Sequence, residues 1–195
     1  MATTTLRELN GFDETPASLT DAVVVMVDFQ KTYTEGVMEL DGHAAAIAEG
    51  KKLLEAARAA GTPVIHIQDS GYDPDSDGGK IIADVAPAAG EGSVIKSVPN
   101  GFHNTDLAEQ IEKTGRTNII LAGFMTNMCI LFTAQGAFLN GLHPTVVANA
   151  CGTRALSTRI KGNGTTVAAQ DVHNGALATV TELYGVVVDT VTDLS

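Results

Sequence analysis

The stretch Thr117-Asn-Ile-Ile-Leu-Ala-Gly-Phe-Met-Thr-Asn-Met-Cys129 joins a predicted strand to a predicted helix. Residues Ile119–Ala122 form a continuous apolar run that ends at a glycine, which is typical of a strand buried on both faces. Apolar residues then recur at helical spacing over Ile130–Phe138, and Asn140-Gly141 supplies a C-terminal stop. The pattern therefore predicts that Cys129 lies in the first turn of a helix that follows a buried strand.

This position favours chemistry on sulfur. Free backbone N–H groups and the helix dipole both favour an anion at a helix N-terminus, so they would stabilise a thiolate of Cys129. The same N–H groups can hold an oxyanion during acyl transfer. The alternative is that Cys129 is a small apolar residue that packs the strand–helix junction, because free cysteine is often buried.

Strand-like and helical segments alternate along the rest of the chain. Strands are predicted at 22–28, 63–68, 93–96, 143–149 and 186–189, and helices at 43–60, 105–114 and 165–184. Residues 1–20 are expected to be a polar lead-in. This alternation predicts a single domain over residues 1–195, a three-layer α/β/α sandwich with a mostly parallel central sheet. Specificity is expected to depend on the loops 31–42, 69–92 and 151–163 or on a neighbouring subunit.

Composition excludes several classes of function. The 195 residues include 12 Lys and Arg against 23 Asp and Glu, a net charge of −11, and no basic stripe. A nucleic-acid or anionic-membrane surface is therefore not expected. No apolar run approaches the length of a membrane span, and the N-terminus has no apolar signal core, so the predicted location is cytoplasmic. Two cysteines do not make a disulfide framework.

Three chemically useful residues stand at the ends of three predicted strands. They are Asp28, Lys96 and Cys129. Ligands bind beyond the carboxyl ends of the strands in such a sheet, so we expect the three side chains to converge there. Together they would supply a nucleophile, a carboxylate that moves its proton and a cation that holds charge. Each has a simpler interpretation as a loop cap, a solvated strand end or a packing residue.

Three blocks of sequence resemble the isochorismatase-like cysteine hydrolases, a family that includes nicotinamidase and N-carbamoylsarcosine amidase. The blocks are Val25-Met-Val-Asp-Phe-Gln30, Lys96-Ser-Val-Pro-Asn-Gly-Phe-His-Asn-Thr-Asp-Leu107 and Gly123-Phe-Met-Thr-Asn-Met-Cys129. The third block is followed by an Ala-x-x-x-Gly segment and by Asn149-Ala-Cys-Gly-Thr-Arg154. Their order and spacing cover nearly the whole chain.

The resemblance implies the roles of several residues. Asp28, Lys96 and Cys129 would form a catalytic triad. The peptide bond between Phe124 and Met125 would be cis, and the N–H groups of Met125 and Cys129 would form the oxyanion hole. Relatives that assemble into oligomers imply a homo-oligomer, and the expected partner is a small-molecule substrate.

Two departures from the family pattern narrow the expected activity. Nicotinamidases carry an Asp-x-His metal site after the second strand, whereas this chain has Gln68-Asp-Ser-Gly71 without a closely following histidine. We therefore expect no metal and no other cofactor. Members that cleave the vinyl ether of isochorismate often lack the cysteine, so Cys129 favours attack on the C–N bond of a small amide, ureide or carbamoyl compound.

Substrate contacts and rival functions stay open at this stage. Gln30 and Tyr33, just beyond Asp28, are candidate substrate contacts, although loop polarity explains them equally well. Phe102 and Phe124 are further candidates, and Phe102 could equally fill the core. One rival function is vinyl-ether hydrolysis with Asp28 as general acid. The others are a catalytically silent small-molecule binder and a redox sensor built on Cys129 and Cys151.

Overall fold

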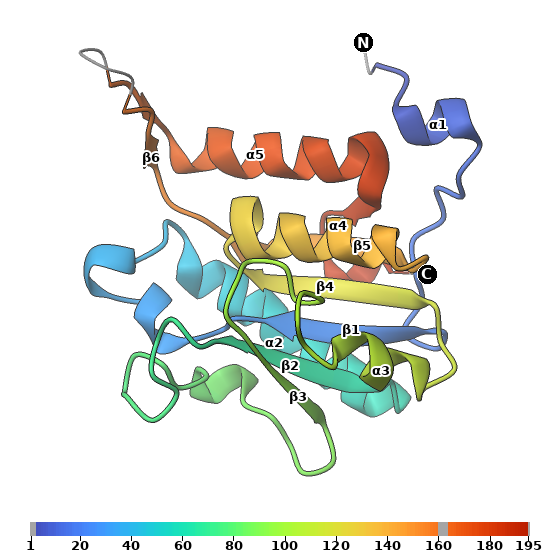
Figure 1. Ribbon diagram of the computed structural model, residues 1–195, viewed down its shortest axis with the longest axis horizontal. Helices are drawn as coiled ribbons and strands as arrows, with labels where there is room; N and C mark the ends of the chain where they lie inside the picture. The colour runs from blue at the N-terminus through green and yellow to red at the C-terminus, as the bar shows by residue number, and fades with distance from the viewer. Residues whose placement is uncertain (1–2, 160–163, 195) are drawn as a thin grey trace.

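Six parallel strands form the central sheet, in the order β3-β2-β1-β4-β5-β8 (Figure 1). The computed structural model describes residues 3–159 and 164–194. The strands are β1 Ala22–Val27, β2 Val64–Asp69, β3 Gly92–Lys96, β4 Asn118–Phe124, β5 His143–Gly152 and β8 Val186–Val188. All six predicted strands are confirmed, because each is a short apolar run bounded by turn residues.

Helices cover both faces of this sheet, which confirms the predicted three-layer α/β/α fold (Figure 1). Helix α2 lies on one face, and α3, α4 and α5 lie on the other. Their bounds are α2 His43–Ala60, α3 Leu107–Glu112, α4 Leu131–Leu139 and α5 Ala169–Thr179. Short 3-10 helices span Lys31–Tyr33, Gly36–Met38, Ala83–Val85 and Val191–Asp193.

Strand β1 shows why the central strands are apolar throughout. Successive side chains of a strand point to opposite faces of the sheet. Val24 and Met26 pack in the cluster on the α2 face, whereas Val23 and Val25 pack in the cluster on the α4 face. All six residues of β1 are buried. A strand covered by helices on both faces therefore carries no polar alternation.

Some local elements differ from the predictions. Residues 1–20 are not entirely irregular, because Thr5 and Glu8 form a capping box that begins α1 at Leu6–Asn10. The predicted helix 165–184 begins later, at Ala169, and ends in a π-helical turn at Val180–Tyr184. The predicted helix 105–114 is shortened to Leu107–Glu112, with Asp106 at its N-cap.

A small hairpin also departs from the expected connection 151–163. Strands β6 Leu156–Ser157 and β7 Thr166–Val167 pair antiparallel. Two-residue strands are too short to produce a period in the sequence, which is why the pattern did not reveal them.

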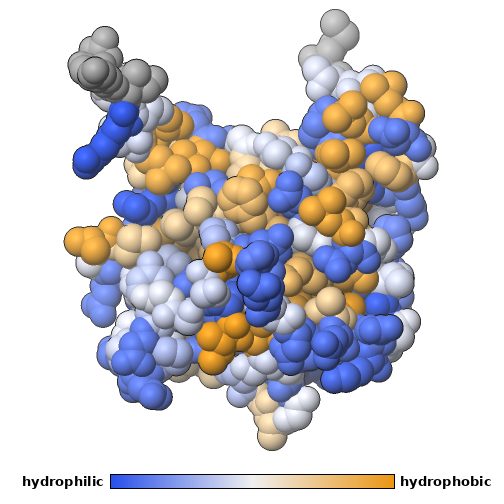
Figure 2. Space-filling view, in the orientation of Figure 1, coloured by the Kyte–Doolittle hydropathy of each residue, from blue (hydrophilic) through white to orange (hydrophobic). Residues whose placement is uncertain are grey.

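The molecular surface is apolar near the N-terminal helix. Figure 2 shows hydrophobic side chains over α1, at the upper right of the view. Leu9 is 70% exposed, and Leu6 and Phe12 are also exposed. This segment is relevant to the predicted self-association, which is tested below.

The order of the strands places a switch point between β1 and β4. The chain steps outward from β1 to β2 and β3, and then returns to β4 on the other side of β1. Ligands bind at such reversals of strand order. Close approach of the two strands requires Gly123, since a Cβ there would lie 1.8 Å from the Val27 carbonyl oxygen. Its φ of 137° is also in the region that favours glycine.

Candidate active site

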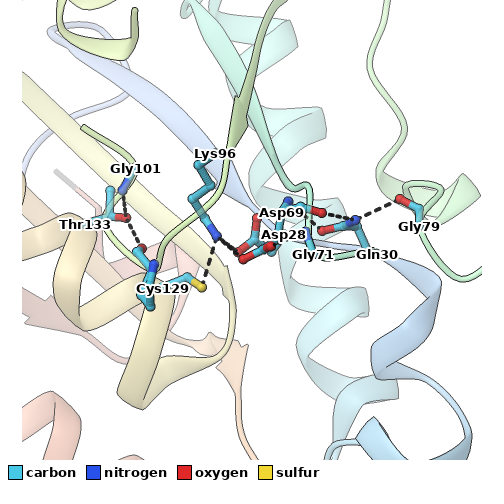
Figure 3. A network of polar contacts seen from close by, with 10 residues as sticks. Asp28, Gln30, Asp69, Gly71, Gly79, Lys96, Gly101, Cys129 and Thr133 are labelled. Carbon is cyan, nitrogen blue, oxygen red and sulfur yellow. Dashed lines mark hydrogen bonds and ion pairs between the residues drawn. The ribbon is translucent and has the colours of Figure 1, made fainter. Parts of the chain in front are cut away.

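The Lys96 ammonium lies at the centre of a buried polar cluster (Figure 3). Its Nζ is 2.7 Å from Asp28 Oδ2 and 2.8 Å from Asp69 Oδ2. It also donates a hydrogen bond to Cys129 Sγ at 3.2 Å. The structure therefore brings together Asp28, Lys96 and Cys129, as the sequence predicted.

Each of the three residues is placed by the end of a strand. Lys96 is the last residue of β3, Asp28 follows β1, and Cys129 follows β4 in the π-helical turn Thr126–Ile130 that leads into α4. Carboxyl oxygens of Asp28 and Asp69 and the Cys129 sulfur all lie within 4.8 Å of one another. The carboxyl ends of parallel strands meet at one edge of the sheet, so residues far apart in sequence become neighbours there.

The turn that carries Cys129 begins with an unusual backbone. The Phe124–Met125 peptide bond is cis, as the family resemblance implied. The Met125 carbonyl oxygen accepts hydrogen bonds from the N–H groups of Met128 at 3.0 Å and Ile130 at 3.2 Å. Cys129 therefore lies in a turn whose backbone is fixed before α4 begins.

Asp28 is a buried carboxylate whose only close cation is Lys96 among the described residues. Its Oδ2 lies 2.7 Å from Lys96 Nζ, so the ammonium is the close polar partner of this carboxylate in the described part of the chain. Burial raises the pKa of Asp28 from 3.8 to about 6, and the Lys96 charge opposes the rise. At neutral pH Asp28 is therefore ionised yet ready to accept a proton.

The protonation state of Cys129 corrects one expectation. Lys96 and the helix N-terminus were expected to favour the thiolate. The pKa of Cys129 is instead raised, first by burial and then by the nearby Asp28 charge, and Lys96 only partly offsets this. The pKa of Lys96 is raised as well, because its contacts with Asp28 and Cys129 outweigh its burial. The resting site therefore holds a thiol, an ammonium and a carboxylate.

Two predicted substrate contacts after β1 lie in different environments. Gln30 is fully buried, and its amide bonds the backbone of Asp69 and the carbonyl oxygen of Gly79. Tyr33 packs edge-on against Phe124 at a centroid distance of 5.8 Å. The pKa of Tyr33 is raised, mainly by burial and then by the charge of nearby Asp28. Gln30 thus holds loops in place, and Tyr33 borders the cluster.

The two predicted phenylalanine contacts pack in different clusters of the core. Phe124 is fully buried and packs against Phe29 at 4.9 Å on the α2 face. Phe102 packs over Gly136 of α4. Their roles as substrate contacts stay predictions, and packing accounts for both positions.

Asp69 is the site residue that sequence reasoning missed. It was considered only as part of an absent metal motif. It ends β2, the strand between β3 and β1, and it pairs in register with Lys96. The sequence showed that Asp69 stands at the end of a predicted strand. The order of the strands was needed to show that this end lies next to Lys96.

A cation already occupies the centre of the donor groups. Asp28, Asp69 and Cys129 form the group of described residues whose ligand atoms could hold a metal. The Lys96 ammonium contacts all three of them. These donors are therefore engaged by a protein cation, and the predicted independence from metal is tested below with a chelator.

A cavity of about 660 Å³ is lined by residues other than Asp28, Asp69, Lys96 and Cys129. Its walls come from α2, the end of β5 and α5. Two of its residues contact the Cys129 turn: His173 Nδ1 is 2.9 Å from Thr126 Oγ1, and Thr153 Oγ1 donates to Asn127 Oδ1 at 2.6 Å. The reacting groups lie in the cluster, where Asp69 is the partly exposed member, with 20% of its side chain accessible.

The predicted cytoplasmic location stays a prediction. In the described ranges 3–159 and 164–194, no helix has the length and apolar character needed to cross a membrane. A similar protein is described as a secreted isochorismatase effector of Verticillium dahliae. It is 30% identical, over 93% of this chain and 95% of that protein.

Comparisons with other known proteins agree with the observed fold. A solved structure described as an isochorismatase from Pseudomonas putida has a TM-score of 0.92 and 32% identity, and the match covers 98% of this chain and 99% of the other. A maleamate amidohydrolase from Pseudomonas putida is 31% identical, over 74% of this chain and 75% of that protein. Residues 22–190 match the family described as the isochorismatase domain. The chain therefore belongs to the isochorismatase family of hydrolases.

Proposed function

We propose that this protein is a cysteine hydrolase that cleaves the C–N bond of a small amide, ureide or carbamoyl compound. One observation carries the proposal. The Cys129 thiol lies 3.2 Å from the Lys96 ammonium and within 4.8 Å of a buried Asp28 carboxylate, which is itself 2.7 Å from the same ammonium. A nucleophile beside a base oriented by a third group is the usual arrangement of covalent catalysis. The maleamate amidohydrolase relative acts, by its name, on an amide.

The first half of the reaction forms a thioester. As Cys129 Sγ attacks the carbonyl carbon, its proton passes to Asp28, so that a free thiolate is never needed. The C–S bond forms, and the carbonyl oxygen becomes an oxyanion that the N–H groups of Met125 and Cys129 stabilise. The C–N bond then breaks, and protonated Asp28 gives its proton to the leaving nitrogen.

The second half releases the acid. Asp28, now a carboxylate again, takes a proton from water as the water oxygen attacks the thioester carbon. The C–S bond breaks, and the Cys129 sulfur regains its proton from Asp28. Lys96 stays protonated throughout, because its pKa is raised, and it stabilises the negative charge that develops on sulfur and on Asp28.

The test is a screen for ammonia release from small primary amides, ureides and carbamoyl compounds. Replacing Cys129 with Ala should abolish release, whereas Cys151→Ala is the matched control, since Cys151 is also a free buried cysteine. With an active substrate, a hydroxylamine-sensitive acyl adduct on Cys129 should be detected by mass spectrometry of the intact protein.

The pH dependence gives a second readout. Because Asp28 must be unprotonated to accept the thiol proton, kcat/KM should fall as the pH drops through about 6. Ammonia release that persists in Cys129→Ala would contradict the proposal. Release of pyruvate from an enolpyruvyl ether, without ammonia release from any amide, would support vinyl-ether hydrolysis instead.

A further inference from the structure

Lys96 has a partner for each of its three N–H donors. An ammonium has three N–H donors and no acceptor. Lys96 has three close partners: Asp28 at 2.7 Å, Asp69 at 2.8 Å and Cys129 at 3.2 Å. The predicted triad accounts for two of these partners, and Asp69 is the third.

The strand order explains why a third partner is needed. Lys96 stands on the edge strand β3, whereas Cys129 follows β4, three strands away. Neighbouring strands are about 4.8 Å apart, so the strand axes are separated by about 14 Å. The Lys96 side chain must therefore extend across the end of β2, and Asp69 stands at that end (Figure 3).

Asp69 is itself held firmly. Its Oδ1 accepts the Gly71 N–H at 2.7 Å, which leaves Oδ2 for Lys96. The Gln30 amide bonds both the N–H and the carbonyl oxygen of Asp69, at 2.9 and 3.2 Å. A side chain fixed by such contacts can in turn fix the group that it touches.

Asp69 also adds a negative charge to the cluster. The titratable groups around Cys129 are Asp28 after β1, Asp69 on β2, Lys96 on β3 and Tyr33, which borders them. Two carboxylates share one ammonium, so less of the positive charge is available to sulfur. Burial is the main cause of the raised pKa of Asp28, and the Asp69 charge adds a smaller effect in the same direction.

We propose that Asp69 is a positioning residue of the hydrolase proposed above: it draws the Lys96 ammonium partly toward β2, away from Cys129, and so keeps the resting sulfur protonated. It does so by supplying a fixed second carboxylate to the lysine. The thiol then loses its proton only as substrate is attacked, which protects it from unproductive alkylation or oxidation between turnovers.

The test uses Asp69→Asn, which keeps the shape of the side chain and its acceptor for Gly71 but removes the charge. Thiolate absorbance in the ultraviolet, taken as the difference from the same protein with Cys129→Ser, measures the ionisation of Cys129 directly. We expect the apparent pKa of Cys129 to fall by about one unit, which corresponds to a roughly tenfold increase in thiolate at a fixed pH. Iodoacetamide labelling of Cys129 should become faster by a similar factor. The matched control is Asp77→Asn, which removes an exposed carboxylate that pairs with Lys31.

An unchanged or raised pKa of Cys129 in Asp69→Asn would overturn the proposal, because a merely structural role cannot make the thiol more acidic. If this variant does not fold, Asp69→Ser removes the same charge and retains a small acceptor. Both readouts follow the sulfur itself and need no substrate. If no hydrolysis is found in any screen, the proposed function fails, yet the shift in Cys129 still decides the role of Asp69.

Discussion

Replacing Asp28 with Asn should stabilise the folded protein while it abolishes turnover. Asp28 is buried, and its ion pair with Lys96 does not fully compensate for the loss of water around the carboxylate. Burial raises its pKa from 3.8 to about 6. Because the folded state binds this proton more tightly than the unfolded chain does, ionisation of Asp28 destabilises the fold.

The magnitude follows from the shift. About two pKa units, at about 1.4 kcal/mol each, give roughly 3 kcal/mol of lost stability once Asp28 is ionised. The loss develops as the pH rises from about 4 to about 6 and is complete above that range. Asn mimics the protonated side chain, so Asp28→Asn should be more stable than the native protein by about 3 kcal/mol near pH 8. For a chain of this size, Tm should rise by roughly 6–12 °C.

The assay is urea unfolding near pH 8 and near pH 4, at one protein concentration, beside ammonia release. The matched control is Asp84→Asn, which removes an exposed carboxylate 3.0 Å from Lys51 and should change stability by less than about 1 kcal/mol. An Asp28→Asn protein that is no more stable than the native one near pH 8 would refute the reasoning. So would a gain of the same size near pH 4, where Asp28 is protonated in the folded state and about half ionised in the unfolded chain, so that a gain of less than about 1 kcal/mol is expected.

Three further predictions test the fold, the metal and the assembly. Gly123→Ala should prevent stable folding, since the new Cβ would meet the Val27 carbonyl oxygen. The control Gly175→Ala lies in an open position within α5 and should raise the free energy of unfolding by about 1 kcal/mol. The soluble yield and the Tm of the two variants test this prediction. Ammonia release should survive a strong chelator, and a loss that zinc or another divalent ion restores would show that the absence of an Asp-x-His motif was misinterpreted. Light scattering should give a multiple of the 20.2 kDa chain mass, and a monomer mass at every concentration would contradict the predicted homo-oligomer.

Much of the fold could be predicted because its signals are local. The uniformly apolar stretch Ala22–Val27 indicated a strand covered on both faces, and all six residues are buried. Helix α2 spans His43–Ala60 as predicted, and Gly61 ends it in the left-handed conformation that glycine adopts without strain. Asp28, Lys96 and Cys129 could be named in advance because each follows or ends such a strand.

The remaining features depend on distances between segments that are far apart in the sequence. Only the tertiary structure placed β2 between β3 and β1, which makes Asp69 a partner of Lys96. Only the tertiary structure decided the charge on Cys129, because burial and the Asp28 carboxylate together outweigh the Lys96 ammonium. A local pattern records neither how much water surrounds a side chain nor which charges lie within a few ångströms of it. The residue types that could carry the chemistry were therefore determined by the sequence alone, and their protonation states by the packing of the strands.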